Sequence, residues 1–249
     1  MLDLDIKDIL IISTEQDQPQ FKNLLGDGSN FGIHLSYSTQ HKPNGIAEGL
    51  IIAEKFLCGD KCVFILGDNL FIGSFAQSKI KEELKKEKGA TIFTYNVEDP
   101  ERYGVISIDL NGQPIDIVEK PKKFISNNAI TGIYFYDQHA VSIAKSLKPS
   151  NRNELEITDV NKKYLEKKLL RIVNLDKNIT WLDAGTINSL YECSNFVSTI
   201  EKRTGVKIAC LEEIAYLKEY ISLSALKKNR FRYGSSEYGL YLDKVINNR

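Results

Sequence analysis

Two carboxylates in this sequence directly follow apolar runs, where a charged side chain is unexpected unless it has a structural or chemical role. Asp68 ends the run in "VFILGD", and Asp183 ends the run in "ITWLD", one small residue before Gly185. Two acidic side chains at one edge of a sheet could hold a hard cation such as Mg²⁺, which prefers oxygen ligands and accompanies phosphates. In a second interpretation Asp68 starts a turn and Asp183 caps the next helix, because aspartate favours both positions. Spacing alone leaves both interpretations open.

Strand and helix patterns alternate in the region that must position Asp68. Apolar or β-branched runs predict strands at 8–14, 34–39, 62–68 and 90–97, and amphipathic or capped segments predict helices at 19–28, 44–57 and 76–89. This alternation predicts an α/β fold with a doubly wound, mostly parallel, Rossmann-like sheet and the 62–68 strand near its centre. Ligands bind beyond the carboxyl ends of strands in such sheets, which places Asp68 on the ligand side.

The pattern changes after Tyr103, where "YGVISIDLNGQPIDIVEKP" contains two alternating runs around Asn111-Gly112. This is a strong hairpin signal, so we expect a β-hairpin insertion in the sheet. Further runs predict strands at 129–137 and 169–175 and helices at 138–147, 157–168 and 186–203. No linker or internal repeat interrupts the chain, which predicts one domain over 1–249 with a helical appendage at 205–249.

Composition narrows the class of protein. A chain of 249 residues that is 42% hydrophobic suits one large α/β domain. Lys+Arg and Asp+Glu are balanced at 33 each, so no global field favours nucleic acid or an anionic membrane surface. No leader pattern opens the sequence, and no apolar run approaches the ~20 residues of a membrane span. We therefore expect a cytoplasmic protein with neither a nucleic-acid nor a membrane partner.

Several segments occur together in a recognisable order: "LLGDGSNFGIHLSY", "QHKPNGIAEGLIIAEKF", "LGDNLF", "DPERYGVISID", "VEKP", "TGIYFYD", "NELEITDVNKKYLE" and "WLDAGT". Together they resemble the bacterial sugar nucleotidyltransferases, from about Ile6 to beyond Glu213. The motifs "EKP" and "GDN" are shared across that family. "DPERYGV" with "ELEITDVN" is more specific to its thymidylyltransferase branch.

The resemblance implies an activity. Members of the family join a sugar 1-phosphate to a nucleoside triphosphate and release pyrophosphate with the help of Mg²⁺. For this chain the implied reaction transfers a thymidylyl group from dTTP to glucose 1-phosphate, giving dTDP-glucose for deoxysugar and surface polysaccharide synthesis. The family commonly assembles into tetramers, which implies a homo-oligomer.

The resemblance also assigns roles to particular residues. Asp68 and Asp183 match the metal aspartates, and Asp68 with Lys120 would be catalytic. Gln40 could offer its amide to a pyrimidine base, and Gly45 would allow close backbone approach to that base. Without the resemblance, Gln40 is also an ordinary polar residue at the start of a loop.

Further matching positions surround the sugar and its phosphate. Glu119 could accept hydrogen bonds from sugar hydroxyls, and Lys120 could place a point charge near the phosphate. A surface ion pair beside Pro121 is the alternative for these two residues. The matching positions are Tyr103, Gly104, Glu119, Lys120 and Tyr134.

One departure from the family concerns its opening strand and glycine-rich Gly-Thr-Arg loop, which this sequence does not contain. That loop supplies backbone N–H groups to phosphates. We therefore expect an amino-terminally truncated chain, active only if a separate amino-terminal fragment or a longer start supplies the segment. The alternative is a catalytically inactive relative that serves as a sugar-nucleotide binding or subunit-interaction protein.

Overall fold

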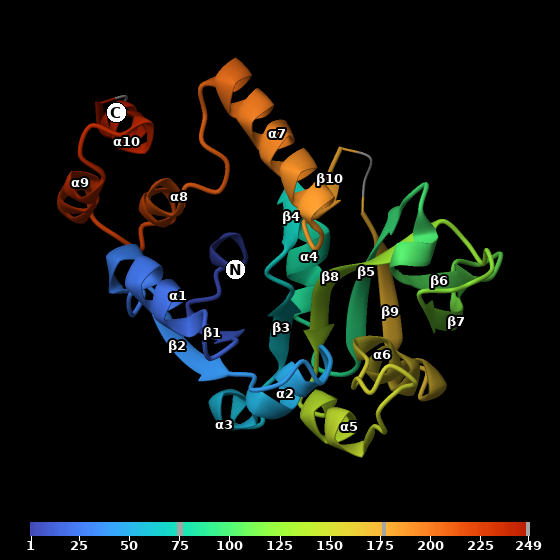
Figure 1. Ribbon diagram of the computed structural model, residues 1–249. Coiled ribbons are helices and arrows are strands. Elements are labelled where there is room, and N and C mark those ends of the chain that lie inside the picture. Colours follow the sequence, from blue (N-terminus) through green and yellow to red (C-terminus); the bar gives the residue numbers. More distant parts are fainter. Residues whose placement is uncertain (74–76, 176–177, 248–249) are drawn as a thin grey trace. The chain divides into compact units, whose positions relative to one another are not determined.

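The computed structural model describes residues 1–73, 77–175 and 178–247 (Figure 1). The chain divides into two compact units: a terminal unit of Met1–His41 with Ser194–Arg249, and a central unit of Lys42–Cys193. Each unit has an apolar core of its own. The expectation of one domain over 1–249 with an appendage at 205–249 concerns how these units combine, and it stays a prediction.

The terminal unit contains a parallel pair of strands, β1 (Asp8–Ser13) and β2 (His34–Thr39). Parallel neighbours need a crossover connection, and α1 (Gln18–Leu25) provides it. Pro19 lies in the first turn of α1, where its missing N–H has no intrahelical partner to lose, and the helix ends at Gly26 with φ +63°. The strand, helix and strand predicted here are confirmed.

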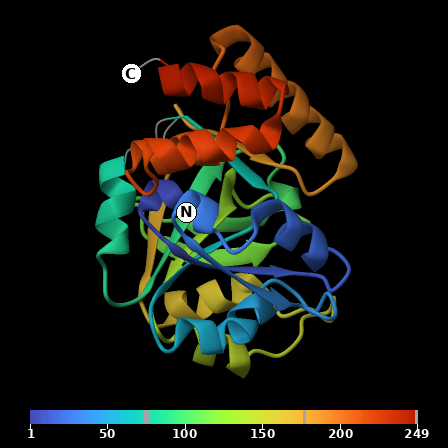
Figure 2. The same cartoon turned by 90° about the vertical axis from the view of Figure 1, so that its left-hand side faces the viewer.

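Short helices complete the terminal unit, and α8, α9 and α10 pack on one another around buried Leu226 and Leu242 (Figure 2). The hydroxyl of Ser222 accepts a hydrogen bond from the Ala225 N–H at 3.2 Å and so caps the start of α9. The elements are η1 (Leu2–Leu4), η2 (Ser29–Phe31), α8 (Leu211–Leu217), α9 (Leu223–Arg230), η4 (Phe231–Tyr233), α10 (Glu237–Asn247) and the end of α7 (Ile187–Thr204), which begins in the central unit.

A six-stranded sheet is the centre of the central unit, with strand order β7-β6-β8-β5-β9 and with β3 also paired to β8. Its long strand β8 is almost wholly buried. The predicted hairpin is confirmed as β6 and β7, which pair so that Gly104 lies opposite Glu119. The strands are β3 (Cys62–Ile65), β5 (Ala90–Asn96), β6 (Gly104–Ile108), β7 (Pro114–Glu119), β8 (Asn128–Tyr136) and β9 (Leu170–Asn174).

The α/β fold class is confirmed, but the expectation of a mostly parallel sheet is wrong for the described strand pairs. Among the strands that the structure describes, β1 with β2 and β5 with β9 run parallel, and the other pairs are antiparallel. The apolar segment 62–68 suggested a central parallel strand, yet β3 runs antiparallel to β8 and its side chains are half-buried. A continuous apolar run reports burial and not the direction of its neighbour, which explains the error.

A separate two-stranded ribbon follows β3. Here β4 (Asn69–Ile72) pairs antiparallel with β10 (Thr180–Asp183), so that Asn69 lies opposite Asp183. The sequence predicted one strand over 62–68 that ends in the Asp68 carboxylate. The structure instead ends β3 at Ile65, turns through Gly67 and Asp68 with the Asn69 N–H donating to the Leu66 carbonyl, and begins β4 directly afterwards.

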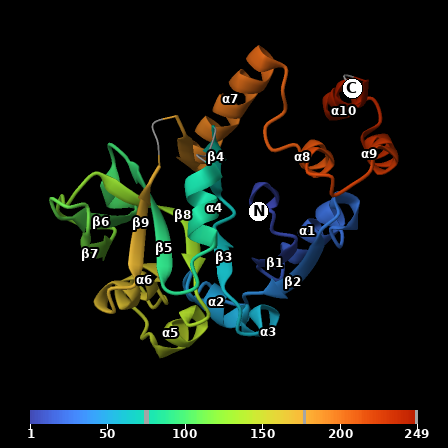
Figure 3. The same ribbon diagram turned by 180° about the vertical axis from the view of Figure 1, so that it is seen from behind.

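Helices cover both faces of the six-stranded sheet. Figure 1 shows α6 in front of β5 and β9, and the reverse view in Figure 3 shows α4 in front of the sheet. The predicted helix at 44–57 begins only at Glu48, because segment 44–47 is instead hydrogen-bonded to the backbone of Leu155, and it is divided at Ala53 into two short helices. The helices are α2 (Glu48–Ile52), α3 (Glu54–Leu57), α4 (Gln77–Leu84), η3 (Pro100–Arg102), α5 (Ala140–Ser146) and α6 (Ile157–Glu166). Across the described residues, none of the helices is both long and apolar enough to span a membrane.

Candidate active site

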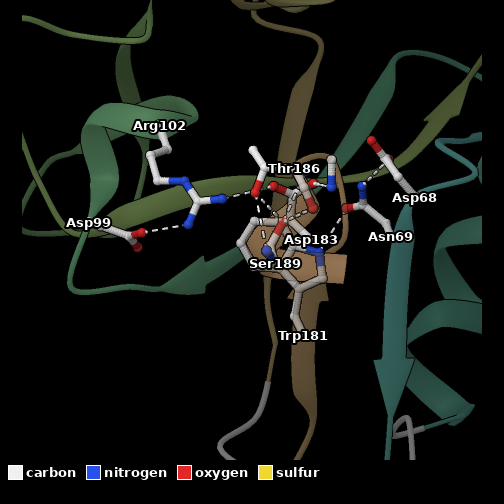
Figure 4. Close-up of polar contacts among 9 residues, drawn as sticks. Asp68, Asn69, Asp99, Arg102, Trp181, Asp183, Thr186 and Ser189 are labelled. Carbon is white, nitrogen blue, oxygen red and sulfur yellow. Dashed lines mark hydrogen bonds and ion pairs between the residues drawn. The ribbon is translucent and has the colours of Figure 1, made fainter. Parts of the chain in front are cut away.

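The β4–β10 ribbon brings the two candidate metal ligands together (Figure 4). Asp68 directly precedes β4 and Asp183 ends β10, and the Ala184 N–H donates to the Asp68 carbonyl at 2.8 Å. A Cβ built on Gly185 would lie 3.2 Å from both Asp68 Oδ2 and Asp183 Oδ1. Because Gly185 has no side chain, the space between the two carboxylates stays open.

The capping alternative for Asp183 is not what the structure contains. The helix after it, α7, starts with a reciprocal pair in which the Ser189 N–H donates to Thr186 Oγ1 at 3.1 Å and the Thr186 N–H donates to Ser189 Oγ at 3.0 Å. Thr186 therefore caps this helix. Asp68, by contrast, does lie in a turn, so its position satisfies both interpretations drawn from the sequence.

Asn69 fixes the orientation of the Asp68 carboxylate. Its Oδ1 accepts hydrogen bonds from the Gly132 N–H at 2.8 Å and from the Trp181 indole N–H at 2.7 Å. These two donors determine which way the amide faces, so Nδ2 is directed to Asp68 Oδ1 at 2.8 Å. Sequence reasoning did not give Asn69 a role, although it belongs to the "GDN" motif.

Arg102 supplies positive charge at this ribbon. Its guanidinium donates to Asp99 Oδ2 at 2.8 Å and to Asp183 Oδ2 at 3.3 Å, and the hydrogen bond to Asp99 raises the pKa of Arg102 above its ordinary value. Burial, and then the neighbouring Asp68, raise the pKa of Asp183, while Arg102 acts in the opposite direction. A cation between the two aspartates would oppose both effects, because it stabilises the ionised carboxylate.

The donor set at the ribbon fits Mg²⁺. Among the described residues, no cluster of three or more His, Cys, Asp or Glu side chains forms a complete metal cage. Mg²⁺ does not need one, because it is usually bound by one or two carboxylates with water and substrate phosphates as its other ligands. Asp68 and Asp183 on either side of the open space at Gly185 meet that requirement.

A second polar group surrounds Glu119 at the end of β7. Its Oε2 accepts a hydrogen bond from the Thr158 hydroxyl at the start of α6, and its Oε1 lies 3.6 Å from Arg152 Nη2. A Cβ on Gly104 would lie 3.1 Å from Thr158 Oγ1 and 3.2 Å from Glu119 Oε2. Gly104 therefore leaves room for the carboxylate and its hydroxyl partner.

Arg152 is itself surrounded by carboxylates. It donates to Glu156 from Nε at 3.0 Å and from Nη2 at 2.7 Å, and Nη2 also lies 3.2 Å from Glu154 Oε2. Although burial opposes ionisation, the hydrogen bonds from Arg152 and Ser150 keep the pKa of Glu156 below its usual value. Neither Arg152 nor Thr158 was singled out from the sequence; Thr158 lies within "ELEITDVN", which was used as a family motif.

Aromatic side chains form a wall of the site. The ring centroids of Tyr103 and Trp181 lie 5.0 Å apart, and the ring centroid of Tyr95 lies 5.9 Å from that of Trp181. Burial raises the pKa of Tyr103 to about 12 and also raises that of Tyr134, which is 4% exposed. Both phenols are therefore neutral near pH 7 and can donate hydrogen bonds. Trp181 is buried and also lines the cavity described next, so it serves both the packing and the wall of the site.

One cavity of about 550 Å³ joins these groups within the central unit. Lys120 lies at its edge with φ +43°, and its N–H donates to the Tyr103 carbonyl at 3.0 Å. The cavity thus has a two-carboxylate end and an end lined by Glu119 and Arg152. The residues predicted from the sequence that line it are Asp68, Tyr103, Gly104, Glu119, Lys120, Tyr134 and Asp183.

Two further predicted residues lie elsewhere. Gln40 belongs to the terminal unit, directly after β2, and its N–H donates to the Ser13 carbonyl at 2.9 Å. Gly45 belongs to the central unit with φ +104°, and a Cβ there would lie 2.4 Å from the Leu155 carbonyl oxygen. Backbone packing therefore already requires a glycine at this position. The roles of Gln40 and Gly45 toward a base stay predictions.

Comparisons with known proteins show the family of this chain. Residues 1–200 match the model of the family described as nucleotidyl transferase. The glucose-1-phosphate thymidylyltransferase of Neisseria meningitidis serogroup A is 43% identical over 241 residues, which cover 97% of this chain and 84% of the relative. The Xanthomonas campestris pv. campestris protein of the same name is 44% identical, with 95% and 80% covered.

Solved structures give the same result. A putative glucose-1-phosphate thymidylyltransferase from Bacillus anthracis in complex with a sucrose superposes with a TM-score of 0.72 at 39% identity, over 78% of this chain and 79% of that one. A UDP-glucose pyrophosphorylase complexed with UDP-glucose, at 22% identity and a TM-score of 0.66 over 81% and 84%, shares the fold. The chain therefore belongs to the nucleotidyl transferase family of enzymes.

Proposed function

We propose that this protein transfers a thymidylyl group from dTTP to glucose 1-phosphate, giving dTDP-glucose and pyrophosphate in a reaction that depends on Mg²⁺. One observation supports this most directly. The aspartate pair suited to a metal ion, Asp68 and Asp183, lines the same cavity as Glu119, which is suited to sugar hydroxyls. The names of relatives that are more than 40% identical point to the same substrates.

In the proposed reaction, a phosphate oxygen of glucose 1-phosphate attacks the α-phosphorus of dTTP. A new P–O bond forms there, the bond to the β-phosphate breaks, and pyrophosphate leaves. Bound at Asp68 and Asp183, Mg²⁺ supplies charge neutralisation for the phosphates. The protein's own work is positioning and electrostatics, so no side-chain nucleophile is required.

The end of the cavity around Glu119 would bind the sugar phosphate. Glu119 accepts hydrogen bonds only, which suits sugar hydroxyls, and the Thr158 hydroxyl holds it in one orientation. Lys120 and Arg152 line the same cavity and offer positive charge to the phosphate. The neutral hydroxyl of Tyr134, kept protonated by burial, adds a donor.

The nucleoside would be recognised by Gln40 and Gly45, as the resemblance implies. An amide presents both a donor and an acceptor, which matches the imide edge of a pyrimidine. We further propose that dTDP-glucose feeds deoxysugar and polysaccharide synthesis and that the protein acts as a homo-oligomer. These parts rest on the family alone.

The test is pyrophosphate release from dTTP, glucose 1-phosphate and Mg²⁺, followed with a coupled assay and by isolating dTDP-glucose. The assay is run on this chain alone and on the chain with the amino-terminal segment supplied. With the segment supplied, we expect product with dTTP, less with UTP, and none without a divalent cation. Turnover by this chain alone would refute the expectation that a separate amino-terminal segment is needed. Binding of dTDP-glucose without any turnover, even with such a segment supplied, would contradict the proposal and support the inactive binding protein.

A further inference from the structure

Arg102 lies between two carboxylates of unequal exposure (Figure 4). The Asp99 side chain is 45% exposed and the Asp183 side chain 19% exposed, and the guanidinium reaches both, at 2.8 Å and 3.3 Å. Asp99 belongs to the loop before η3, and Asp183 ends β10. Arg102 therefore connects a surface aspartate to an aspartate of the proposed metal site.

The Arg102 guanidinium binds Asp183, the same carboxylate that would bind the metal ion. A Cβ built on Gly185 would lie 3.2 Å and 3.7 Å from Asp183 Oδ1 and Oδ2 and 3.2 Å from Asp68 Oδ2, so both carboxylates border this glycine. Asp183 Oδ2 is the atom to which Arg102 donates. A divalent cation held by Asp68 and Asp183 would have to share Asp183 with a guanidinium, and the two positive charges would repel each other.

The pair between Arg102 and Asp183 is also easy to break. It consists of one hydrogen bond at 3.3 Å, and the Arg102 side chain is 39% exposed, so water can replace the contact. The shorter bond to Asp99 and the Tyr103 ring, whose centroid lies 5.3 Å from Cζ, would retain the guanidinium after it leaves Asp183. The geometry thus allows exchange without a change in the backbone.

We propose that Arg102 is the resident counter-ion of the metal site: it neutralises Asp183 when no cation is bound, and a divalent cation binds in competition with it. This inference rests on the proposed function, because it takes Asp68 and Asp183 as the metal ligands. Its consequence is selectivity. A free cation would gain only two carboxylate ligands when it displaces Arg102. A cation that is already bound to a nucleotide keeps its phosphate ligands as well, so the site would favour the nucleotide-bound cation.

The test measures Mn²⁺ binding without nucleotide, by titration with detection of free Mn²⁺ in electron paramagnetic resonance. We expect Arg102→Gln and Arg102→Met to bind Mn²⁺ about threefold to tenfold more tightly than the wild type. Arg102→Lys, which keeps the charge, should stay within about twofold of the wild type. No turnover is needed for this readout.

Two controls separate the possible failures. Arg152→Gln removes the same charge from the same cavity but no contact with Asp183, and it should tighten Mn²⁺ binding less than half as much. Asp183→Asn should abolish Mn²⁺ binding.

If Asp183→Asn still binds Mn²⁺, or if neither the wild type nor the Arg102 variants bind Mn²⁺, the metal site of the proposed function fails and the inference fails with it. If Asp183→Asn abolishes binding but Arg102→Gln binds Mn²⁺ no more tightly than the wild type, or Arg152→Gln tightens it equally, the counter-ion role alone is overturned.

Discussion

The cavity contains two arginine–carboxylate groups that differ in geometry. Arg152 makes a two-pronged contact with Glu156, at 3.0 and 2.7 Å, and the Glu156 side chain is 9% exposed. Arg102 reaches Asp183 with one hydrogen bond at 3.3 Å. The two arginines are almost equally exposed, at 41% and 39%, so exposure does not cause the difference.

The difference in hydrogen-bond geometry matches the different roles of Glu156 and Asp183. A two-pronged contact fixes both partners, which suits Glu156 directly before α6 at the rim of the cavity. A single long contact to Oδ2 leaves Asp183 Oδ1, among the described residues, with only the Gly185 N–H as a donor, at 3.3 Å, which suits an aspartate expected to receive a cation. The same pair of residue types can therefore fix a structure or keep a ligand site ready, and hydrogen-bond geometry distinguishes the two uses.

Removing a metal ligand should have the largest effect. Asp68→Asn keeps the shape of the side chain but removes half of the negative charge of the aspartate pair. In the protein supplied with its amino-terminal segment, we expect turnover to fall by at least about 100-fold. The measurement is the steady-state rate of pyrophosphate release across a Mg²⁺ titration, with circular dichroism to check the fold. Asp60→Asn, an exposed aspartate of the same unit, is the matched control and should behave as wild type. Normal turnover of Asp68→Asn would exclude Asp68 from the reaction.

At the other end of the cavity, Glu119→Gln should act on the sugar substrate. The amide loses the charge and one of the two acceptors, so we expect KM for glucose 1-phosphate to rise roughly tenfold to thirtyfold while KM for dTTP changes little. Initial rates at varied concentrations of each substrate measure this split. Glu166→Gln, on the exposed end of α6, is the control. Equal changes in both KM values would contradict a sugar-specific role.

A smaller effect of the same kind is expected for Gly104→Ala. The added methyl would lie 3.1 and 3.2 Å from Thr158 Oγ1 and Glu119 Oε2, so the carboxylate must shift by a few tenths of an ångström. We expect KM for glucose 1-phosphate to rise about threefold to tenfold. In Gly67→Ala the methyl meets no atom within 4 Å, so this variant controls for the added methyl. Similar kinetics for the two variants would show that the Glu119 position tolerates the shift.

The smallest effect is expected for the two-pronged pair of Arg152 and Glu156. Hydrogen bonds from Arg152 and Ser150 keep the pKa of Glu156 below its ordinary value of 4.5, so the folded state favours the ionised acid. The stability that this ionisation contributes is fully present above pH 4.5 and is lost as the pH falls through the lower pKa of the folded protein. Glu156→Gln should be destabilised at pH 7 by about 1 kcal/mol, and by less at acidic pH. Urea unfolding at several pH values measures this, and a pH-independent difference would count against an ionised Glu156.

Sequence reasoning found the residues with strong local signals. The hairpin around Asn111-Gly112, the strands at both ends of the alternating region and the carboxylates after apolar runs all depend on neighbours in sequence. Those signals were enough to place Asp68 and Asp183 among the candidates. They did not show that the two belong to one ribbon, because β4 and β10 are distant in sequence and neither has a periodicity that identifies its partner.

The residues that were missed share a physical reason. Arg102 and Arg152 are charged residues in polar loops, and a single sequence cannot distinguish them from ordinary surface charges. Their importance comes from carboxylates that reach them across the fold, such as Asp183 for Arg102. The prediction of a mostly parallel sheet was wrong for a related reason. Apolar runs indicate that a strand is covered, whereas its direction depends on how the strands are connected, which periodicity does not show.

The chain contains a single tryptophan, and it lies in the wall of this cavity. The indole of Trp181 donates to Asn69, which in turn holds Asp68, and its ring packs against Tyr103. Any ligand that reorders the aspartate pair changes the surroundings of that one fluorophore. The protein therefore has a built-in optical reporter of its own site, readable in the unlabelled molecule by excitation near the red edge of tryptophan absorption, where the twelve tyrosines do not contribute.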